Sequence, residues 1–204
     1  IIHMKPVGPA DLRLPAAGDA YPVIEVIPGQ IVTRKRMKKV EVRDNFILPD
    51  PANDILKLIV IERHKATGNI GKGLVSGFGL KRGALASSIA HDSHNIVAVG
   101  TSDEEILEAV RVVEEMQGGL AAVSEGNVEA SLALPIAGLL STEPAQAVAE
   151  ALERLEERAR EMGSTLPAPF AVLSFLALPV IPDLRLTDLG LVDVKAFKLV
   201  YQTN

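Results

Sequence analysis

Four strand-like segments follow one another between residues 55 and 101, before any segment with a convincing helical pattern. All four are rich in Val, Ile, Leu or Ala, and turn residues separate them: ILKLIVIERH (55–64), GLVSGFG (73–79), GALASSIAH (83–91) and NIVAVGT (95–101). Short apolar runs divided by glycine-bearing turns are typical of antiparallel strands. We therefore expect an antiparallel meander of about four strands rather than a doubly wound parallel sheet.

A helix and a hairpin are expected next. Residues 102–117 can be capped by Ser102, Glu105 can complete a capping box, and an apolar stripe stops before Gly118. Residues 120–134 contain two apolar runs around the turn sequence Glu-Gly-Asn, which suits positive φ angles. This region therefore predicts one helix packed on the sheet and one further hairpin.

A second helix is expected over residues 142–162. Thr142 can cap it, Pro144 suits its first turn, and a second apolar stripe ends at Gly163. Because the strand candidates precede the first helix, the order of elements predicts an α+β fold: a mainly antiparallel sheet with helices packed on it.

The first fifty residues have a different pattern. Short alternating patches, VIEVI at 23–27 and KVEV at 39–42, stand among prolines and glycines. We expect a short β-rich N-terminal arm over residues 1–53 and an α+β domain over residues 54–204. The basic run at 34–39 is interpreted as a solvated strand rather than an anion site, because charge runs are usually surface features.

Composition excludes several classes of function. The net charge of −5 and the aromatic content of 3%, without tryptophan, disfavour binding to nucleic acid. Prolines interrupt the most apolar stretch, residues 166–182, so we expect no membrane-spanning helix. The absence of cysteine excludes disulfides and thiolate metal sites and favours a cytoplasmic protein.

Two glycine-rich runs resemble nucleotide-binding loops but fail on spacing. GNIGKG at 68–73 has Ala66 where a phosphate loop needs glycine and Gly73 where it needs Ser or Thr. In GFGLKRG at 77–83 the glycines are spaced one residue too long for a dinucleotide fingerprint. We expect these glycines to mark bends and close contacts between strands.

The sharpest chemical candidate is the run His91-Asp92-Ser93-His94-Asn95 between two predicted strands. A turn there can direct both imidazoles and the carboxylate toward one cleft, whereas on a continuous strand the two histidines would face opposite ways. His91, Asp92 and His94 are thus candidate catalytic contributors, and Ser93 and Asn95 are candidate substrate-binding residues.

Two neighbouring residues extend this hypothesis. Glu62 or His64, at the end of the first predicted strand, could supply further ligands to the turn. The structural alternative is that Asp, Ser and Asn bond their own backbone while the histidines serve as satisfied core groups. Both interpretations remain open at the level of sequence.

The wording of the chain is more specific than its composition. Five segments, in this order, are similar to the C-terminal region of bacterial adenine deaminases, which belong to the amidohydrolase superfamily: IPGQIVT (27–33), DILKLIVIERH (54–64), GKGLVSGFGLKRGALASSIAHDSHNIVAVGT (71–101), LPIAGLLS (134–141) and LSFLALPVIPDLRLTDLGLVDV (173–194). The resemblance covers nearly the whole chain.

This resemblance implies a part of an enzyme rather than a whole one. The superfamily binds its metal in a (β/α)8 barrel with a His-x-His pair, but this chain has no such pair and is shorter than the roughly 250 residues that a barrel needs. The chain begins with Ile1, as expected of a downstream piece. We therefore expect the barrel-free C-terminal domain, inactive alone, with no metal or other cofactor bound in this chain.

The family also implies partners and chemistry. Hydrolysis of adenine to hypoxanthine and ammonia needs a metal-activated hydroxide and a proton donor for the leaving nitrogen, and the barrel supplies both. The implied partners are that barrel with manganese, iron or zinc, the substrate adenine, and further copies in a homo-oligomer. Alternative hypotheses are a stand-alone purine-binding module and a structural domain for oligomerisation.

Overall fold

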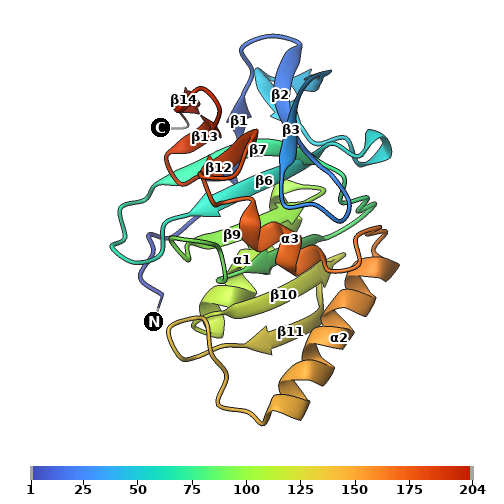
Figure 1. The fold of residues 1–204 in the computed structure, drawn as a ribbon, viewed down its shortest axis with the longest axis vertical. Helices are drawn as coiled ribbons and strands as arrows, with labels where there is room; N and C mark the ends of the chain where they lie inside the picture. Colours follow the sequence, from blue (N-terminus) through green and yellow to red (C-terminus); the bar gives the residue numbers. More distant parts are fainter. Residues whose placement is uncertain (1, 203–204) are drawn as a thin grey trace.

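An eight-stranded sheet lies at the centre of the computed structural model, which describes residues 2–202 (Figure 1). The strand order is β11-β10-β8-β9-β6-β7-β2-β3, and neighbours are antiparallel except for the parallel pair β2–β7. The strands are β2 (Ala20–Val26), β3 (Thr33–Lys39), β6 (Leu56–Ile61), β7 (Ile70–Ser76), β8 (Ala84–Ser87), β9 (Ile96–Gly100), β10 (Gly119–Ser124) and β11 (Asn127–Ala133). The predicted α+β class with a mainly antiparallel sheet is confirmed.

The four strands predicted between residues 55 and 101 form, but their predicted meander order is wrong. β6 pairs with β7 and β9, while β8 pairs with β9 and β10. Every residue of β6 is buried, so this strand lies in the middle of the sheet. The carboxylate of Asp54 accepts hydrogen bonds from the backbone N–H of Gly77 (2.6 Å) and Gly79 (2.8 Å). These bonds hold the β7–β8 connection beside the start of β6.

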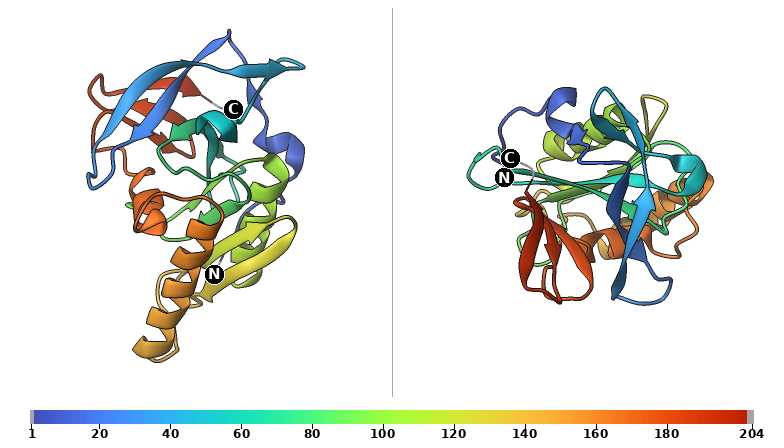
Figure 2. Two further views of the ribbon diagram at one scale, coloured as in Figure 1. Left: turned by 90° about the vertical axis from the view of Figure 1, so that its right-hand side faces the viewer. Right: turned by 90° about the horizontal axis from the view of Figure 1, so that it is seen from above.

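Helices cover both faces of the sheet, as Figure 2 shows. On one face, α1 (Asp103–Glu115) packs its apolar stripe on β6, β8, β9 and β10. The other face carries α2 (Ala145–Glu161), α3 (Pro169–Phe175) and a three-stranded sheet of β12 (Leu184–Thr187), β13 (Gly190–Asp193) and β14 (Lys198–Gln202). The central strands are therefore buried from both sides, which explains their nearly continuous apolar sequence.

The helix starts differ in part from the expected caps. The side chain of Ser102 caps α1 by accepting a hydrogen bond from the backbone N–H of Glu105, as predicted. The carboxylate of Glu105, however, binds the backbone N–H of Glu125 in the β10–β11 hairpin instead of closing a capping box. Thr142 does not cap α2, because the helix begins after Pro144, two residues later. The predicted hairpin around Gly126 is confirmed.

The N-terminal region is β-rich, as predicted. A small sheet of order β1-β5-β4, made of β1 (Leu14–Pro15), β4 (Glu41–Arg43) and β5 (Phe46–Leu48), lies beside two short 3-10 helices, η1 (Pro9–Leu12) and η2 (Pro51–Asn53). β2 and β3 form one edge of the main sheet, with the basic run exposed along β3. The proposed domain boundary at residue 53 stays a prediction.

The apolar stretch 166–182 forms only the seven-residue helix α3, which starts at Pro169. Across residues 2–202, no helix combines the length and the apolar character needed to cross a membrane.

Candidate functional site

The predicted turn between β8 and β9 is real and occupies residues 91–93. The backbone N–H of His91 donates to the carbonyl of Ser174 at the end of α3 (2.9 Å), and that of His94 donates to the carbonyl of Ala90 (2.6 Å). His94 has a φ of 51°, a left-handed conformation that histidine adopts more readily than most residues. The turn is therefore tied both to itself and to α3.

This turn brings the two histidines together. The rings of His91 and His94 lie 5.6 Å apart in an edge-on arrangement. The other neighbour of the His91 ring is Phe175 of α3, at 4.8 Å between ring centroids. Both imidazoles are half-buried, whereas Asp92 and Ser93 are exposed. The geometric condition for a shared site, that the histidines converge, is met.

The bonding of His94 indicates where its proton lies. Its Nδ1 accepts a hydrogen bond from the backbone N–H of Ala90 (3.3 Å), so the neutral ring carries its proton on Nε2. Burial lowers the pKa of His94, and the nearby His91 and Arg63 lower it further. At neutral pH the ring is therefore an uncharged hydrogen-bond donor.

Of the two additional candidates, His64 joins the turn and Glu62 does not. Nε2 of His64 lies 2.8 Å from the carbonyl oxygen of Ser93, a donor–acceptor distance. The carboxylate of Glu62 instead accepts bonds from the backbone N–H groups of His64, Lys65 and Thr67 and from the Thr67 hydroxyl. Burial raises the pKa of Glu62, but these donors outweigh it and the net pKa is lowered.

The two candidate substrate-binding residues differ in accessibility. Asn95 is buried, and its Nδ2 donates to the carboxylate of Asp188 (3.2 Å), which also accepts from Asn69. The Oδ1 atom of Asn95 is buried without a hydrogen-bond partner. Ser93 is exposed and its hydroxyl accepts a long hydrogen bond from the backbone of Asn95 (3.4 Å). A role for either in substrate binding stays a prediction.

Sequence reasoning missed Arg63, which organises the site. Its side chain is buried, with only 2% of the residue exposed. Its Nε donates to the carbonyl of His94, and its Nη2 donates to the carbonyl of Ala137 (2.9 Å). Arg63 thus joins the histidine turn to the loop 134–141 that follows β11. The available signal was a charged residue directly after the buried strand β6.

These residues do not fit a metal site. Nδ1 of His94 is occupied by a backbone N–H, and the carboxylate of Glu62 is saturated by its own loop. Within residues 2–202, no three His, Asp or Glu side chains are arranged so that they could hold a metal ion.

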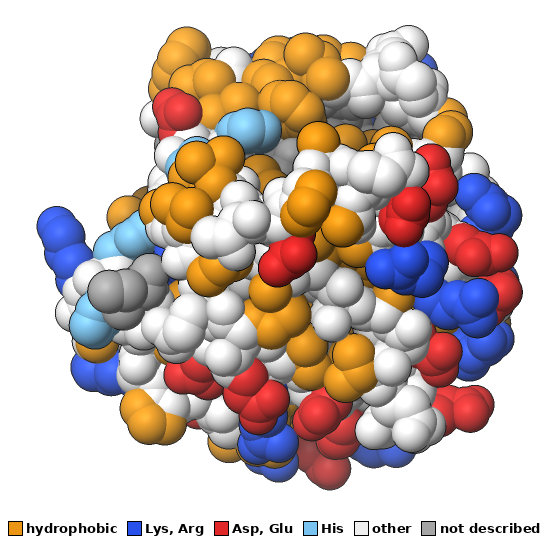
Figure 3. Space-filling view, turned by 90° about the horizontal axis from the view of Figure 1, so that it is seen from below, with side chains coloured by type: hydrophobic (Ala, Val, Ile, Leu, Met, Phe, Trp, Pro, Cys, Tyr) orange, Lys and Arg blue, Asp and Glu red, His pale blue; other side chains and the backbone are white. Residues whose placement is uncertain are grey.

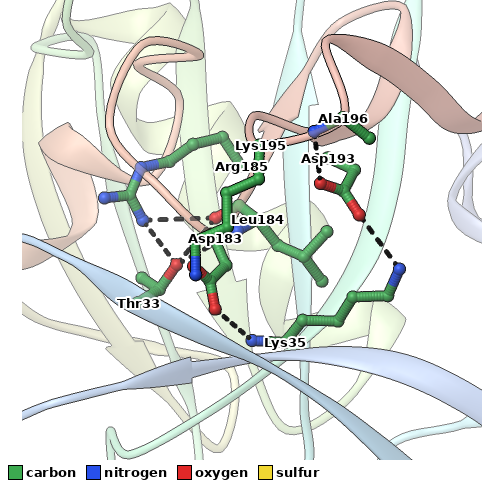
Figure 4. A network of polar contacts seen from close by, with 8 residues as sticks. All are labelled: Thr33, Lys35, Asp183, Leu184, Arg185, Asp193, Lys195 and Ala196. Atoms are coloured by element: carbon green, nitrogen blue, oxygen red, sulfur yellow. Dashed lines mark hydrogen bonds and ion pairs between the residues drawn. The ribbon is translucent and has the colours of Figure 1, made fainter.

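A cavity of about 260 Å³ lies on the other side of Phe175. The loop 27–33 and helix α3 form its walls, and its lining is mainly apolar. A buried arginine, Arg185, fixes this loop: it donates to the carbonyl of Ile31 and to the hydroxyl of Thr33 (3.0 Å), as Figure 4 shows for Thr33. Burial lowers the pKa of Arg185 to about 10, so it stays charged at neutral pH.

Charge is unevenly distributed on the surface near the turn. Figure 3 shows histidine side chains beside hydrophobic ones on the left and upper part of one face, while charged side chains gather along its right and lower edges. The exposed hydrophobic side chains include Ile136 and Leu140, at 47% and 61% exposure, in the loop that Arg63 holds. We call the surface made by residues 91–94 and 134–141 the histidine face.

Comparison with known proteins identifies the family. The family described as the adenine deaminase C-terminal domain matches residues 30–198. An adenine deaminase of Dehalococcoides mccartyi is 55% identical over 201 residues, 98% of this chain and 35% of the relative. An adenine deaminase of Methanothrix thermoacetophila (52% identical) and adenine deaminase 1 of Rhizobium johnstonii (47%) match 94% and 98% of this chain, covering 34% and 35% of their own lengths. This chain therefore belongs to the adenine deaminase C-terminal domain family.

Proposed function

We propose that this chain is the C-terminal part of an enzyme that hydrolyses adenine to hypoxanthine and ammonia. Support comes from family membership and from relatives named adenine deaminase. Because the chain spans about a third of those relatives, the catalytic barrel and its manganese, iron or zinc are expected in the remaining part. In this proposal the complete protein is a cytoplasmic homo-oligomer.

We propose further that the histidine face packs at the mouth of the barrel and helps to close the adenine site. The observation that carries this role is the fixed turn, in which His91 and His94 converge on a surface with few charges. A neutral His94 with its proton on Nε2 can donate a hydrogen bond to a ring nitrogen of a purine. Asp92 and Ser93 are the exposed polar groups beside it.

The apolar cavity beside α3 is a poorer candidate for adenine. A purine carries ring nitrogens and an amino group that need hydrogen-bond partners when buried. The hydroxyl of Thr33, one of the few polar groups of the lining, already binds Arg185 and Leu184. We therefore assign adenine recognition to the histidine face rather than to this cavity.

A chimera tests the proposal directly. It joins the part of the D. mccartyi relative that this chain does not match to the 204 residues studied here, and ammonia release from adenine is measured with manganese or iron. We expect the chimera to be active and the 204-residue chain alone to be inactive. A chimera without activity, beside an active D. mccartyi protein, would overturn the assignment.

The role of the turn is tested in the same chimera. We expect the double variant His91→Ala, His94→Ala to lose activity by about tenfold or more, the usual scale for a lost binding or proton-donating contact. Lys38→Ala in the exposed strand β3 is the control and should retain full activity. Unchanged turnover and Michaelis constant in the double variant would remove the histidines from the active site.

A further inference from the structure

Arg63 is a buried positive charge without a negative partner. Among residues 2–202, no carboxylate forms an ion pair with it, and its two hydrogen bonds go to neutral carbonyl oxygens. Burial alone lowers the pKa of Arg63, with no nearby acid to oppose it. Because an unpaired buried charge is costly, proteins nearly always pair such a group.

The surroundings of Arg63 increase this imbalance. All four histidines of the chain lie around it: His94 and His91 in the turn, His64 against Ser93, and His3, whose backbone N–H donates to the carbonyl of Arg63 (2.8 Å). The nearest buried acid, Glu62, is saturated by its own loop. Asp92 is exposed in the turn and raises the pKa of His94 without pairing with Arg63.

We propose that Arg63 is the docking point for a carboxylate side chain from the part of the polypeptide outside this chain. A planar guanidinium binds a carboxylate with paired, charge-assisted hydrogen bonds, which are roughly twice as strong as neutral ones. The relatives contain about two-thirds of their length beyond the matched region, so such a partner is available in the same protein. This inference rests on the proposed packing of the histidine face against the barrel.

The loop 134–141 provides the route to the buried guanidinium. Ala137, which supplies one of the two carbonyl acceptors, is exposed, and so are the neighbouring side chains of Ile136 and Leu140. A partner that packs on these apolar side chains lies next to Arg63. Its carboxylate can replace the neutral Ala137 carbonyl as the acceptor, while the bond to His94 keeps the turn in place.

Hydrogen–deuterium exchange of the chimera tests this inference. We expect the amides of residues 91–95 and 134–141 to exchange about tenfold more slowly in the chimera than in the 204-residue chain, because docking suppresses local opening. Arg63→Gln, which keeps a donor for the carbonyls but removes the charge, should abolish this extra protection. Arg63→Lys should keep part of it, and Lys65→Gln, an exposed loss of the same charge two residues away, should keep all of it.

The outcomes separate the two proposals. If the unmodified chimera gives no extra protection, the docking of the histidine face is wrong. If extra protection appears and Arg63→Gln retains it, docking stands and the carboxylate is wrong. Should Arg63→Gln fail to fold, high salt replaces it: protection that is insensitive to salt would contradict a charged contact. Equal protection of the 204-residue chain by acetate alone would assign the site to a free carboxylate and overturn the polypeptide source.

Discussion

Two buried arginines hold two surface loops of this protein in similar ways. Arg63 and Arg185 are 2% and 0% exposed, and each donates to carbonyl oxygens of a loop that is distant in sequence. Arg63 fixes the histidine turn and the loop 134–141, while Arg185 fixes the loop 27–33 beside the apolar cavity. In both places a cation satisfies backbone groups that the sheet leaves unpaired.

Their electrostatic surroundings differ. Asp183 stabilises the charge of Arg185 and belongs to a network with Lys35, Asp193 and Lys195, in which both acids face basic residues (Figure 4). Arg63 has histidines as its neighbours and no acid paired with it in the part of the chain described. The comparison indicates that the Arg185 site is complete within this chain, whereas the Arg63 site needs a further component.

The largest effect is expected at the complete site. Arg185→Met removes three charge-assisted hydrogen bonds and leaves the carbonyls of Ile31 and Leu184 without their donor. We expect a loss of about 3 kcal/mol in the free energy of unfolding, measured by urea denaturation of the 204-residue chain. Lys35→Ala breaks an exposed ion pair of the same network and should cost below about 1 kcal/mol. Equal losses in both variants would contradict a special role for Arg185.

Two glycines with the same φ of 74° extend the comparison to the two loops. A Cβ on Gly138 would lie 3.0–3.1 Å from the guanidinium of Arg63, which two carbonyls hold in place, whereas a Cβ on Gly29 would meet open space. We expect Gly29→Ala to cost about 1 kcal/mol for the left-handed backbone and Gly138→Ala about 2 kcal/mol. Urea denaturation of both variants measures the difference. A Gly29→Ala loss as large as that of Gly138→Ala would show that Arg63 is free to move.

Local signals in the sequence predicted the elements but not their pairing. Ser102, Gly118 and Gly163 marked helix ends correctly because capping depends on a few neighbouring residues. The position of β6 between β7 and β9, and the parallel pairing of β2 with β7, depend on contacts distant in sequence. Periodicity alone carries no information on such pairing.

The candidate site was predicted to a similar extent. A turn at residues 91–95 follows from its composition, and the approach of His64 follows from the neighbouring strand ends. Arg63 and Arg185 were not predicted to be buried, because a charged residue next to an apolar run normally points to solvent. Their burial depends on carbonyl groups of remote loops, which no local pattern reveals.

Removal of the Arg63 charge is expected to have a smaller effect on the stability of the isolated chain. Arg63→Gln loses a buried cation that has no acid to pair with it, and the new amide can still donate to one carbonyl. We expect a loss of about 1 kcal/mol in urea denaturation, well below that of Arg185→Met. A loss as large as that of Arg185→Met would contradict the incomplete nature of the Arg63 site.

The smallest effect is a pH dependence that belongs to the Arg63 region alone. The pKa of His94 is lowered in the folded state by burial and by His91 and Arg63, so the unfolded chain binds its proton more readily. His94 therefore contributes stability that is complete above its unfolded pKa of about 6.5 and is lost as the pH falls through the lower folded pKa. His94→Asn tolerates the left-handed backbone and lacks this titration. Urea midpoints between about pH 7.5 and about pH 5 should therefore fall less steeply for the variant than for the unmodified chain. Since no histidine contacts Arg185 among the described residues, Arg185→Met should keep the unmodified slope. Parallel slopes for all three proteins would show that His94 does not couple its proton to folding.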